Sequence, residues 1–223
     1  MRSVALLLAC GAALAGCGAT PSIDAESVSN ATLRVRADGC GPRTELGTGT
    51  SIDDGLVVTA AHVVAGATQV EVIDGRGDAR AADVVFFDPA LDVAALRPTS
   101  APSGAATLRG TPGRVGDSGV IAAWSTGGSI ELQEVDVVQR VTILTTDIYG
   151  DIDVERPGLR ITATVEPGDS GAMVHLPDGG VGIVWSRSTE RADQAWTVDV
   201  PEELVRRELR SELVEPVDTG PCP

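Results

Sequence analysis

Residues 166–171 read Glu-Pro-Gly-Asp-Ser-Gly, which places Ser170 between an aspartate and a glycine late in a chain of 223 residues. The chain holds two histidines, and one of them, His62, follows the run Leu-Val-Val-Thr-Ala-Ala at 56–61. Asp92 lies between these two segments, in the run Leu-Asp-Val-Ala at 91–94. A serine hydroxyl becomes an effective nucleophile when an imidazole takes its proton and a carboxylate orients that imidazole. The order His, Asp, Ser therefore supplies the three groups of a hydrolytic triad.

Short apolar runs alternate with Gly, Pro and Asp turns from Ala31 onward, and aromatic residues make up only 3% of the chain. Abundant Val, Ile, Leu and Ala favour an aliphatic core and β structure. The first series of predicted strands covers 32–36, 48–52, 56–59, 69–73, 83–87 and 93–97. The second series covers 120–124, 130–139, 141–146, 159–163, 172–176, 182–186 and 195–198. Closely spaced short strands with turn signals are typical of barrels or sandwiches.

The segment 98–112 is rich in Pro, Ser, Gly and Ala, shows no clear period, and is predicted to link the two series. The sequence thus predicts an all-β fold of two six-stranded antiparallel β-barrels with a C-terminal α-helix. The expected domains are an N-terminal barrel at 31–108, and a second barrel with the terminal helix at 109–223.

The terminal helix is the one long helix that the pattern predicts. Asp199 can cap it, Pro201 suits its first turn, and Pro216 ends it. Leu204 and Leu209 contribute to an imperfect apolar face. A second, short helix is expected to begin at 60–62.

The formal net charge is −15, and every basic residue is an arginine. Nucleic acid is excluded as a partner because phosphate binding needs a basic face. The arginine-only composition is interpreted as codon usage. No spacing typical of metal ligands is visible, so neither a metal nor another cofactor is expected.

The first residues have the pattern of an export signal. Arg2 precedes the apolar run 4–15, which is too short for a permanent membrane helix, and Leu-Ala-Gly-Cys follows at 14–17. This tetrapeptide resembles a bacterial lipobox, in which cleavage before the cysteine leaves a thiol that carries lipid. We therefore expect a signal peptide at 1–16, lipidation of Cys17, and a flexible lipid-anchored tether at 17–30. The alternative is ordinary signal cleavage nearby, with Cys17 incidental.

The cysteine count fits export. Cys10 leaves with the signal and Cys17 takes the lipid, which leaves Cys40 and Cys222 as a pair. In an oxidising compartment this pair is expected to form a disulfide that closes almost the whole domain. The chain-entropy model gives such a bridge a stabilisation on the order of 5 kcal/mol. Two free thiols are the alternative. The expected location is the outer face of a bacterial cell membrane.

The three segments taken together resemble those of trypsin-like serine proteases. Residues 59–62 are similar to the histidine segment of that family, and 168–171 to its nucleophile segment. Residues 88–94 resemble the aspartate segment of the bacterial branch that includes the HtrA/Deg proteases. The likeness covers about 31–215, and it implies the trypsin-like version of the two-barrel fold.

The resemblance also implies roles for single residues. His62 would be the general base, Asp92 would orient it, and Ser170 would attack the peptide carbonyl. The backbone N–H groups of Gly168 and Ser170 would bind the oxyanion that forms. Activity is expected to fall in acid as His62 gains a proton.

Two other residues compete with these assignments. Asp88 precedes Pro89 and is interpreted as a turn former, so Asp92 is the preferred carboxylate. His175 lies five residues after Ser170 in a strand-like run and is interpreted as structural.

The sequence also departs from parts of the family. Val63 follows His62 where animal trypsins have a cysteine, which favours the bacterial branch. In zymogen-activated trypsins the aspartate before the serine pairs with a freshly cut N-terminus, whereas an acylated N-terminus could not supply that partner. We expect Asp169 to pair with an arginine or with backbone donors, and activity to need no cleavage. Only 215–223 follow the predicted helix, so the peptide-binding module of HtrA/Deg proteases is not expected.

The resemblance assigns the substrate pocket to Thr164, Trp185 and Arg187. No acid occupies position 164, which argues against a preference for Lys or Arg. Val184 stands where glutamyl endopeptidases have a histidine, so acid specificity lacks its usual support. Arg187 could attract a carboxylate, or it could be a solvated loop residue. A small or medium aliphatic side chain is the expected preference.

Three functions fit these residues. The first is a membrane-tethered serine endopeptidase whose partner is a polypeptide substrate. The second is an inactive or conditionally active relative that binds polypeptide without cutting it. The third is an esterase, which the order His-Asp-Ser disfavours because α/β-hydrolases run Ser-Asp-His.

Overall fold

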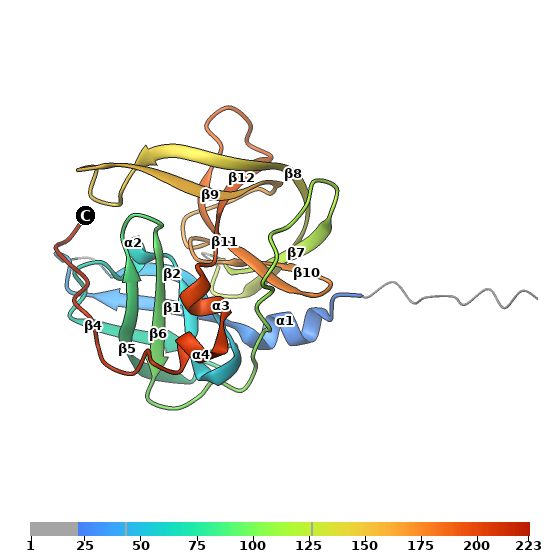
Figure 1. Cartoon of the computed structure of the whole chain (residues 1–223). Helices are drawn as coiled ribbons and strands as arrows, with labels where there is room; N and C mark the ends of the chain where they lie inside the picture. The colour runs from blue at the N-terminus through green and yellow to red at the C-terminus, as the bar shows by residue number, and fades with distance from the viewer. Residues whose placement is uncertain (1–21, 43, 126) are drawn as a thin grey trace, which may run out of the picture.

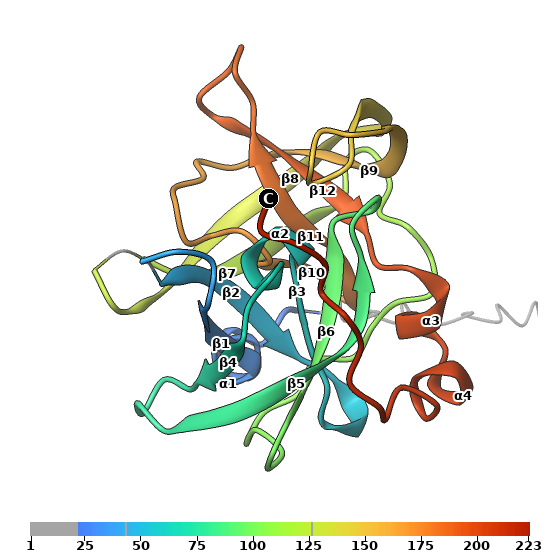
Figure 2. The same cartoon turned by 90° about the vertical axis from the view of Figure 1, so that its left-hand side faces the viewer.

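A computed structural model of the chain describes residues 22–42, 44–125 and 127–223. The predicted signal peptide and the predicted lipidation site Cys17 lie outside the described residues. The described chain forms two β-barrels packed side by side, and the C-terminal segment runs back over the first of them (Figure 1, Figure 2).

The first barrel has six antiparallel strands in the order β1-β2-β3-β6-β5-β4, closed by pairing of β1 with β4. Its strands are β1 (Thr32–Asp38), β2 (Glu45–Ser51), β3 (Val57–Thr59), β4 (Gln69–Ile73), β5 (Ala79–Asp88) and β6 (Val93–Pro98). Burial alternates along β1, where Leu33, Val35 and Ala37 face the core. Such period-two burial lets each strand cover the core with every second side chain.

The second barrel closes in the order β10-β11-β12-β9-β8-β7. Its strands are β7 (Ser118–Trp124), β8 (Ile130–Thr146), β9 (Asp153–Thr162), β10 (Met173–Leu176), β11 (Gly179–Arg187) and β12 (Gln194–Asp199). Its core is aliphatic, with Leu159, Ile161 and Val174 fully buried. Met173 and Ile183 instead pack into the hydrophobic cluster of the first barrel, so the two cores meet across the interface. The predicted all-β fold of two six-stranded antiparallel barrels is confirmed.

One strand of the second barrel is longer than predicted. The sequence suggested separate strands at 130–139 and 141–146, whereas β8 runs through both and pairs with β9 up to Thr146. A bulge between Val137 and Gln139 shifts the register, and it takes the place of the expected break. The hairpin of β8 and β9 therefore brings residues 144–156 to the rim of the molecule beside the first barrel.

The last part of the predicted tether is folded. Helix α1 (Ala25–Ala31) begins at Asp24, whose carboxylate accepts a hydrogen bond from the Glu26 N–H (3.1 Å). Its residues Val28 and Ala31 are buried. The expectation of a flexible segment through residue 30 is thus wrong from Asp24 onward. These two apolar side chains lie one helical turn apart, and the helix contacts β1 of the first barrel and β8 of the second.

The predicted long terminal helix is also corrected. Two single-turn helices stand in its place, α3 (Glu202–Val205) and α4 (Arg207–Arg210), separated by Arg206 in an extended conformation. The guanidinium of Arg210 is buried and donates to the carbonyl oxygens of Leu204 and Val205, both at 2.8 Å. It thereby satisfies carbonyl groups that a continuous helix would have bonded internally. The predicted cap Asp199 pairs with Arg140 instead.

Arg210 also ties the terminal helices to the first barrel. Its guanidinium contacts Asp54 at 3.2 Å, within the 3-10 turn η1 (Asp53–Gly55) that precedes β3. The chain then crosses the first barrel, where the Val217 N–H donates to the Val84 carbonyl (2.8 Å). It ends at the predicted disulfide between Cys40 and Cys222, whose Cα atoms are 5.5 Å apart. The bridge therefore fastens the last residues to the barrel that β1 begins.

Candidate active site

The local fold fixes the position of His62. Strand β3 is entirely buried, and the chain turns from it into the short helix α2 (Ala61–Val64), as the sequence predicted. Ala61 and Val63 on either side of the histidine point into the core, and this leaves the imidazole at the surface of the barrel with 33% of its side chain exposed. The buried side chains of Ala61 and Val63 thus fix the backbone, and the partly exposed imidazole of His62 faces the second barrel.

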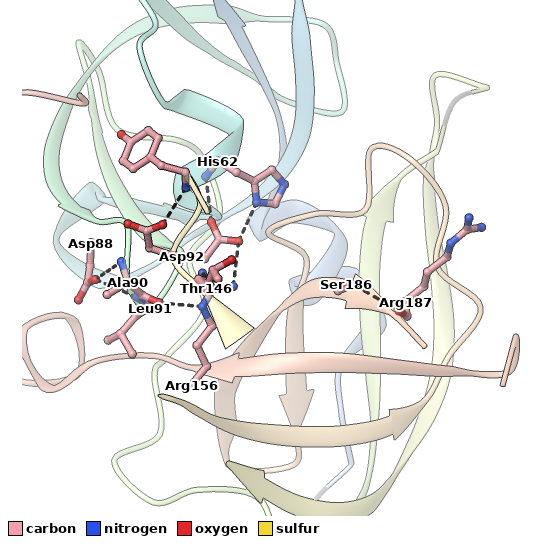
Figure 3. Close-up of polar contacts among 11 residues, drawn as sticks. His62, Asp88, Ala90, Leu91, Asp92, Thr146, Arg156, Ser186 and Arg187 are labelled. Carbon is pink, nitrogen blue, oxygen red and sulfur yellow. Dashed lines mark hydrogen bonds and ion pairs between the residues drawn. The ribbon is translucent and has the colours of Figure 1, made fainter. Parts of the chain in front are cut away.

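Asp92 holds this histidine at two points (Figure 3). Its Oδ1 accepts a hydrogen bond from the His62 backbone N–H (2.9 Å), and its Oδ2 lies 2.8 Å from His62 Nδ1. Asp92 is 2% exposed, so its carboxylate is shielded from water. A proton on Nδ1 is the arrangement that this contact favours, and it leaves the Nε2 lone pair available as a base.

The backbone at Asp92 is strained. Its φ of +63° lies in the left-handed region, where a residue with a β-carbon pays about 1–2 kcal/mol. Asp88 forms the preceding turn, and its Oδ1 accepts hydrogen bonds from the N–H groups of Ala90 and Leu91. Asp88 is therefore the turn former that the sequence suggested, and Asp92 is the carboxylate that reaches the imidazole.

Ser170 enters the site from the second barrel. Its carbonyl accepts from the Thr48 N–H on β2 (2.9 Å). At Gly47, a β-carbon would lie 2.7 Å from Val63 and 3.0 Å from the Ser170 carbonyl, so the serine segment and helix α2 converge on this glycine. No hydrogen bond joins the Ser170 hydroxyl to His62 among the described residues. Contacts between a nucleophile and its base are often long before substrate binds.

The loop around Ser170 leaves two backbone donors free. The N–H groups of Asp169, Gly171 and Ala172 donate to carbonyls of Glu166, Val184 and Asp169 respectively. Those of Gly168 and Ser170 make no hydrogen bond within the described part of the chain. Gly168 has a φ of +105°, a conformation open to glycine, and its carbonyl is held by the Thr48 hydroxyl (2.8 Å). The two predicted oxyanion donors are thus the two amides that the loop does not use.

Asp169 finds a backbone donor. Its Oδ2 accepts from the Glu166 N–H (2.8 Å), and no arginine contacts it among the described residues. Burial raises the pKa of this carboxyl, and the nearby Glu166 and Glu131 raise it further. The sequence suggested either an arginine or backbone donors as partners of Asp169, and the structure shows a backbone donor.

The three predicted pocket residues do not share one cavity. Thr164 lines a hollow of about 360 Å³ together with Glu166 and Asp169. Trp185 lines another of about 310 Å³, beside His62 and Asp92. Arg187 is exposed, and its side chain points away from the His62–Asp92 pair (Figure 3). Two residues apart, Trp185 and Arg187 would share a face in a regular strand, but a bulge between Val184 and Ser186 interrupts the alternation of β11.

The second histidine is structural in its contacts, as predicted. His175 is 4% exposed on β10, and its Nε2 has no hydrogen-bond partner among the described residues. Burial lowers its pKa to about 4. A neutral imidazole at this position is consistent with a packing role.

One charged residue at the site was missed. Arg156 of β9 is 2% exposed, and its guanidinium lies 4.0 Å from Asp92 and stacks 4.7 Å above the Trp185 ring. Burial lowers its pKa, while Asp92, Asp147 and Asp88 act in the opposite direction. The available sequence signal was its inward position in an alternating strand, where an arginine is unusual.

None of the described helices is long and apolar enough to cross a membrane. The described residues also contain no cluster of three or more side chains suited to holding a metal ion.

Comparison with known proteins places these features in a family context. Residues 47–182 match the trypsin-like peptidase domain. The chain is 30% identical over 204 residues to serine proteases Rv3671c and MT3772, from two strains of Mycobacterium tuberculosis. The match covers 91% of this chain and 51% of theirs, so the chain spans about half the length of these curated relatives.

Solved structures agree in fold. The active form of the Rv3671c protease from M. tuberculosis superposes with a TM-score of 0.79 at 28% identity, covering 88% of this chain and 87% of that one. The inactive form of the same protease gives 0.70 at 26% identity, with 85% and 92% covered. An HtrA-type protease, AlgW with a tripeptide, gives 0.67 at 21% identity over 84% of this chain and 62% of its own, a likeness of fold alone.

Proposed function

This chain belongs to the trypsin-like peptidase family, and from that premise we propose that it is a serine endopeptidase that hydrolyses peptide bonds through an acyl-enzyme. The observation that carries this proposal is the double hold of Asp92 on His62, through the backbone N–H and through Nδ1. A merely structural surface histidine has no need of a buried carboxylate that fixes its tautomer.

The reaction follows from the groups at the site. His62 Nε2 takes the proton of the Ser170 hydroxyl as its oxygen attacks the scissile carbonyl. The carbonyl oxygen becomes an oxyanion, which accepts hydrogen bonds from the Gly168 and Ser170 amides. His62 returns the proton to the leaving amine, and a water molecule then releases the acyl group by the same steps in reverse. Asp92 stays ionised throughout and stabilises the imidazolium.

Comparison with the active and inactive forms of the Rv3671c protease supports a catalytically competent arrangement of this site. The fold agrees better with the active form than with the inactive form, at TM-scores of 0.79 and 0.70. The free amides of Gly168 and Ser170 favour the same proposal, because a collapsed oxyanion loop would turn them inward.

Labelling with a fluorophosphonate tests the proposal directly. Such a probe forms a covalent bond with a serine only when that serine is activated. We expect the wild-type protein to take the label and Ser170→Ala to take none. Asp92→Asn keeps the shape of the site but loses the charge, and we expect its labelling rate to fall by about 10⁴-fold.

An unlabelled wild-type protein with native stability would favour the alternative, a protease fold that binds polypeptide without cutting it. If labelling succeeds, cleavage of a peptide library separates a protease from an esterase. The same library tests the preference for small or medium aliphatic side chains.

We also propose that the protein is exported and anchored by lipid at Cys17. The lipobox-like residues 14–17 support this, and a disulfide at Cys40 and Cys222 suits an oxidising compartment. Helix α1 is capped at Asp24, so six residues separate the lipid from the folded domain, and fully extended they span about 20 Å. Incorporation of labelled fatty acid into the wild-type chain, but not into Cys17→Ser, is the expected result. Equal incorporation in both chains would refute it.

A further inference from the structure

The candidate triad has a fourth charged neighbour, the buried arginine on β9. We propose that Arg156 is a positioning residue of this active site: it fixes the Asp92 loop of the first barrel against the second barrel and balances the Asp92 charge. The inference rests on the proposed function of His62, Asp92 and Ser170.

The first observation is the reach of the Arg156 side chain (Figure 3). Its Nε donates to the Ala90 carbonyl (2.7 Å), and its Nη2 donates to the Thr146 carbonyl (3.1 Å). Ala90 belongs to the turn that carries Asp92, whereas Thr146 ends β8 of the second barrel. A rigid, planar guanidinium can hold two carbonyl groups in one fixed geometry. Arg156 therefore joins the two barrels immediately behind the candidate carboxylate.

The second observation is that the Asp92 turn needs support. Asp92 has a φ of +63°, and such strain persists only where the surroundings over-determine the conformation. One side of the turn is held by the Asp88 carboxylate, which accepts hydrogen bonds from the N–H groups of Ala90 and Leu91. The bond from Arg156 to the Ala90 carbonyl holds the other side, two residues before Asp92.

The third observation is the charge. Asp92 is 2% exposed, and among the described residues the arginine that pairs with it is Arg156, whose Nη1 lies 4.0 Å from Asp92 Oδ2. The charges of Asp147 and Asp88 also act on this guanidinium, and together with Asp92 they raise its pKa against the effect of burial. The Oδ1 of Asp147 accepts hydrogen bonds from the backbone N–H groups of Tyr149 and Asp151. While His62 is neutral, Arg156 is the group that compensates the buried carboxylate.

Trp185 completes the arrangement. Its ring packs 4.7 Å from the Arg156 guanidinium, and both residues line the hollow that contains His62. The indole face blocks water from one side of the guanidinium and attracts its charge. The stack therefore helps to keep the guanidinium beside Asp92.

The arrangement predicts a specific pH effect. Removing the cation leaves Asp92, Asp88 and Asp147 uncompensated, and their combined field then favours the protonated form of His62. The acid limb of the rate profile should therefore move to higher pH. The loosened turn should lower kcat, because the imidazole is no longer aimed at Ser170, while KM stays nearly unchanged.

Arg156→Met, which keeps the length of the side chain but removes its charge and donors, is the main test. We expect kcat to fall by about 10- to 100-fold with little change in KM. We expect the acid limb to rise by about half a pH unit or more. Arg156→Lys keeps the charge but cannot hold both carbonyls, so it should lower kcat and leave the acid limb near its wild-type position.

Arg160→Met is the matched control. Arg160 lies on the same strand and also sits over a tryptophan, Trp196, at 5.9 Å, but it does not line the hollow that contains His62. Its substitution should leave kcat and the pH profile as in the wild type. A folded Arg156→Met protein with wild-type kcat and pH profile would overturn the inference, as would an equal shift in Arg160→Met. If Arg156→Met does not fold, wild-type kcat in Arg156→Lys would overturn it and a lowered kcat would support it.

A second readout separates this inference from the proposed function. The chain has only two histidines, so NMR can follow the protonation of the His62 ring without any turnover. The other histidine, His175, is buried, and burial lowers its pKa to about 4. A higher protonation midpoint for His62 in Arg156→Met supports the inference even if the wild type takes no fluorophosphonate, a result that would count against the proposed function alone. An unchanged midpoint in the folded variant counts against the charge role of Arg156.

Discussion

Gly171 packs so closely against Thr48 that a β-carbon on the glycine would lie 2.2 Å from the Thr48 carbonyl oxygen. The glycine follows the candidate nucleophile, and Thr48 belongs to the other barrel. The two barrels therefore meet backbone to backbone directly beside Ser170. Gly171 also has a φ of +89°, which favours glycine. A glycine is therefore needed after Ser170 for both reasons, and the position of the serine depends on it.

Gly171→Ala tests the contact. The β-carbon clashes with main-chain atoms that cannot move aside, and the positive φ adds strain. We expect a loss of about 2–5 kcal/mol in the free energy of unfolding, and loss of fluorophosphonate labelling. Gly77→Ala is the control, since Gly77 has a φ of +90° with open space around it and should cost only about 1–2 kcal/mol. Equal destabilisation by both substitutions, measured by urea unfolding, would contradict the packing argument.

Thr48→Val tests the hydroxyl that holds the oxyanion loop. Thr48 Oγ1 donates to the Gly168 carbonyl (2.8 Å) and accepts from the Trp124 N–H (3.0 Å). Valine keeps the volume but leaves both groups unpaired, at about 1–3 kcal/mol for each. We also expect labelling of Ser170 to slow by about tenfold, because Gly168 is less well placed.

Thr50→Val is the matched control for this experiment. Thr50 lies on the same strand and is fully buried, but its hydroxyl has no hydrogen-bond partner among the described residues. Its replacement should be neutral or stabilising, and labelling should proceed as in the wild type. A Thr48→Val protein as stable and as reactive as Thr50→Val would show that the hydroxyl bridge has no such role.

His175 makes stability depend on pH. Its pKa is lowered by burial to about 4, so the unfolded chain binds a proton before the folded chain does. Stability therefore falls as the pH drops below about 6.5 and levels off near pH 4, with a total loss of up to about 3 kcal/mol. Urea unfolding between pH 7 and pH 4 should show this loss in the wild type and a smaller one in His175→Leu.

Asp169 has the opposite effect on the pH dependence of stability. Burial raises the pKa of its carboxyl, so the folded chain holds this proton more tightly than the unfolded chain. Its contribution to stability grows as the pH falls, and Asp169→Asn should steepen the acid loss that His175 causes. Parallel pH curves for the wild type and both variants would rule out these two groups as the source.

The disulfide between Cys40 and Cys222 can be tested in the same way. Cys40 and Cys222 are 182 residues apart in the chain, and the chain-entropy model gives a stabilisation on the order of 5 kcal/mol for a loop of this size. Cys40→Ala combined with Cys222→Ala should lower the midpoint of urea unfolding. Adding a reductant should produce the same shift in the wild type and none in the double variant. A midpoint that does not respond to either change would exclude the bridge as a stabilising element.

The repeated short apolar runs predicted the two barrels because each strand buries every second residue. The break predicted near residue 140 was wrong because a bulge absorbs the irregularity in β8 without ending it. The long terminal helix was wrong because a propensity argument cannot foresee that Arg210 folds back onto the carbonyls of Leu204 and Val205.

Within the candidate site, the local pattern around Asp92 distinguished it from Asp88, since a residue before proline favours a turn. Arg156 could not be predicted in the same way. Its partners Ala90 and Asp92 lie about 65 residues earlier in the chain, and only the packing of the barrels brings them together. The separation of Trp185 from Arg187 likewise depends on the bulge between Val184 and Ser186 in β11, which a period-two pattern does not reveal.

The bond between Cys40 and Cys222 has one more consequence for a protein that we propose to be a protease. The connection from Pro98 to Ser118 links the half that carries His62 and Asp92 to the half that carries Ser170. A nick anywhere in that connection would leave both halves covalently joined, because one cysteine belongs to each. Self-digestion at this point would therefore go unnoticed on a non-reducing gel and would not release the two parts of the catalytic apparatus from each other.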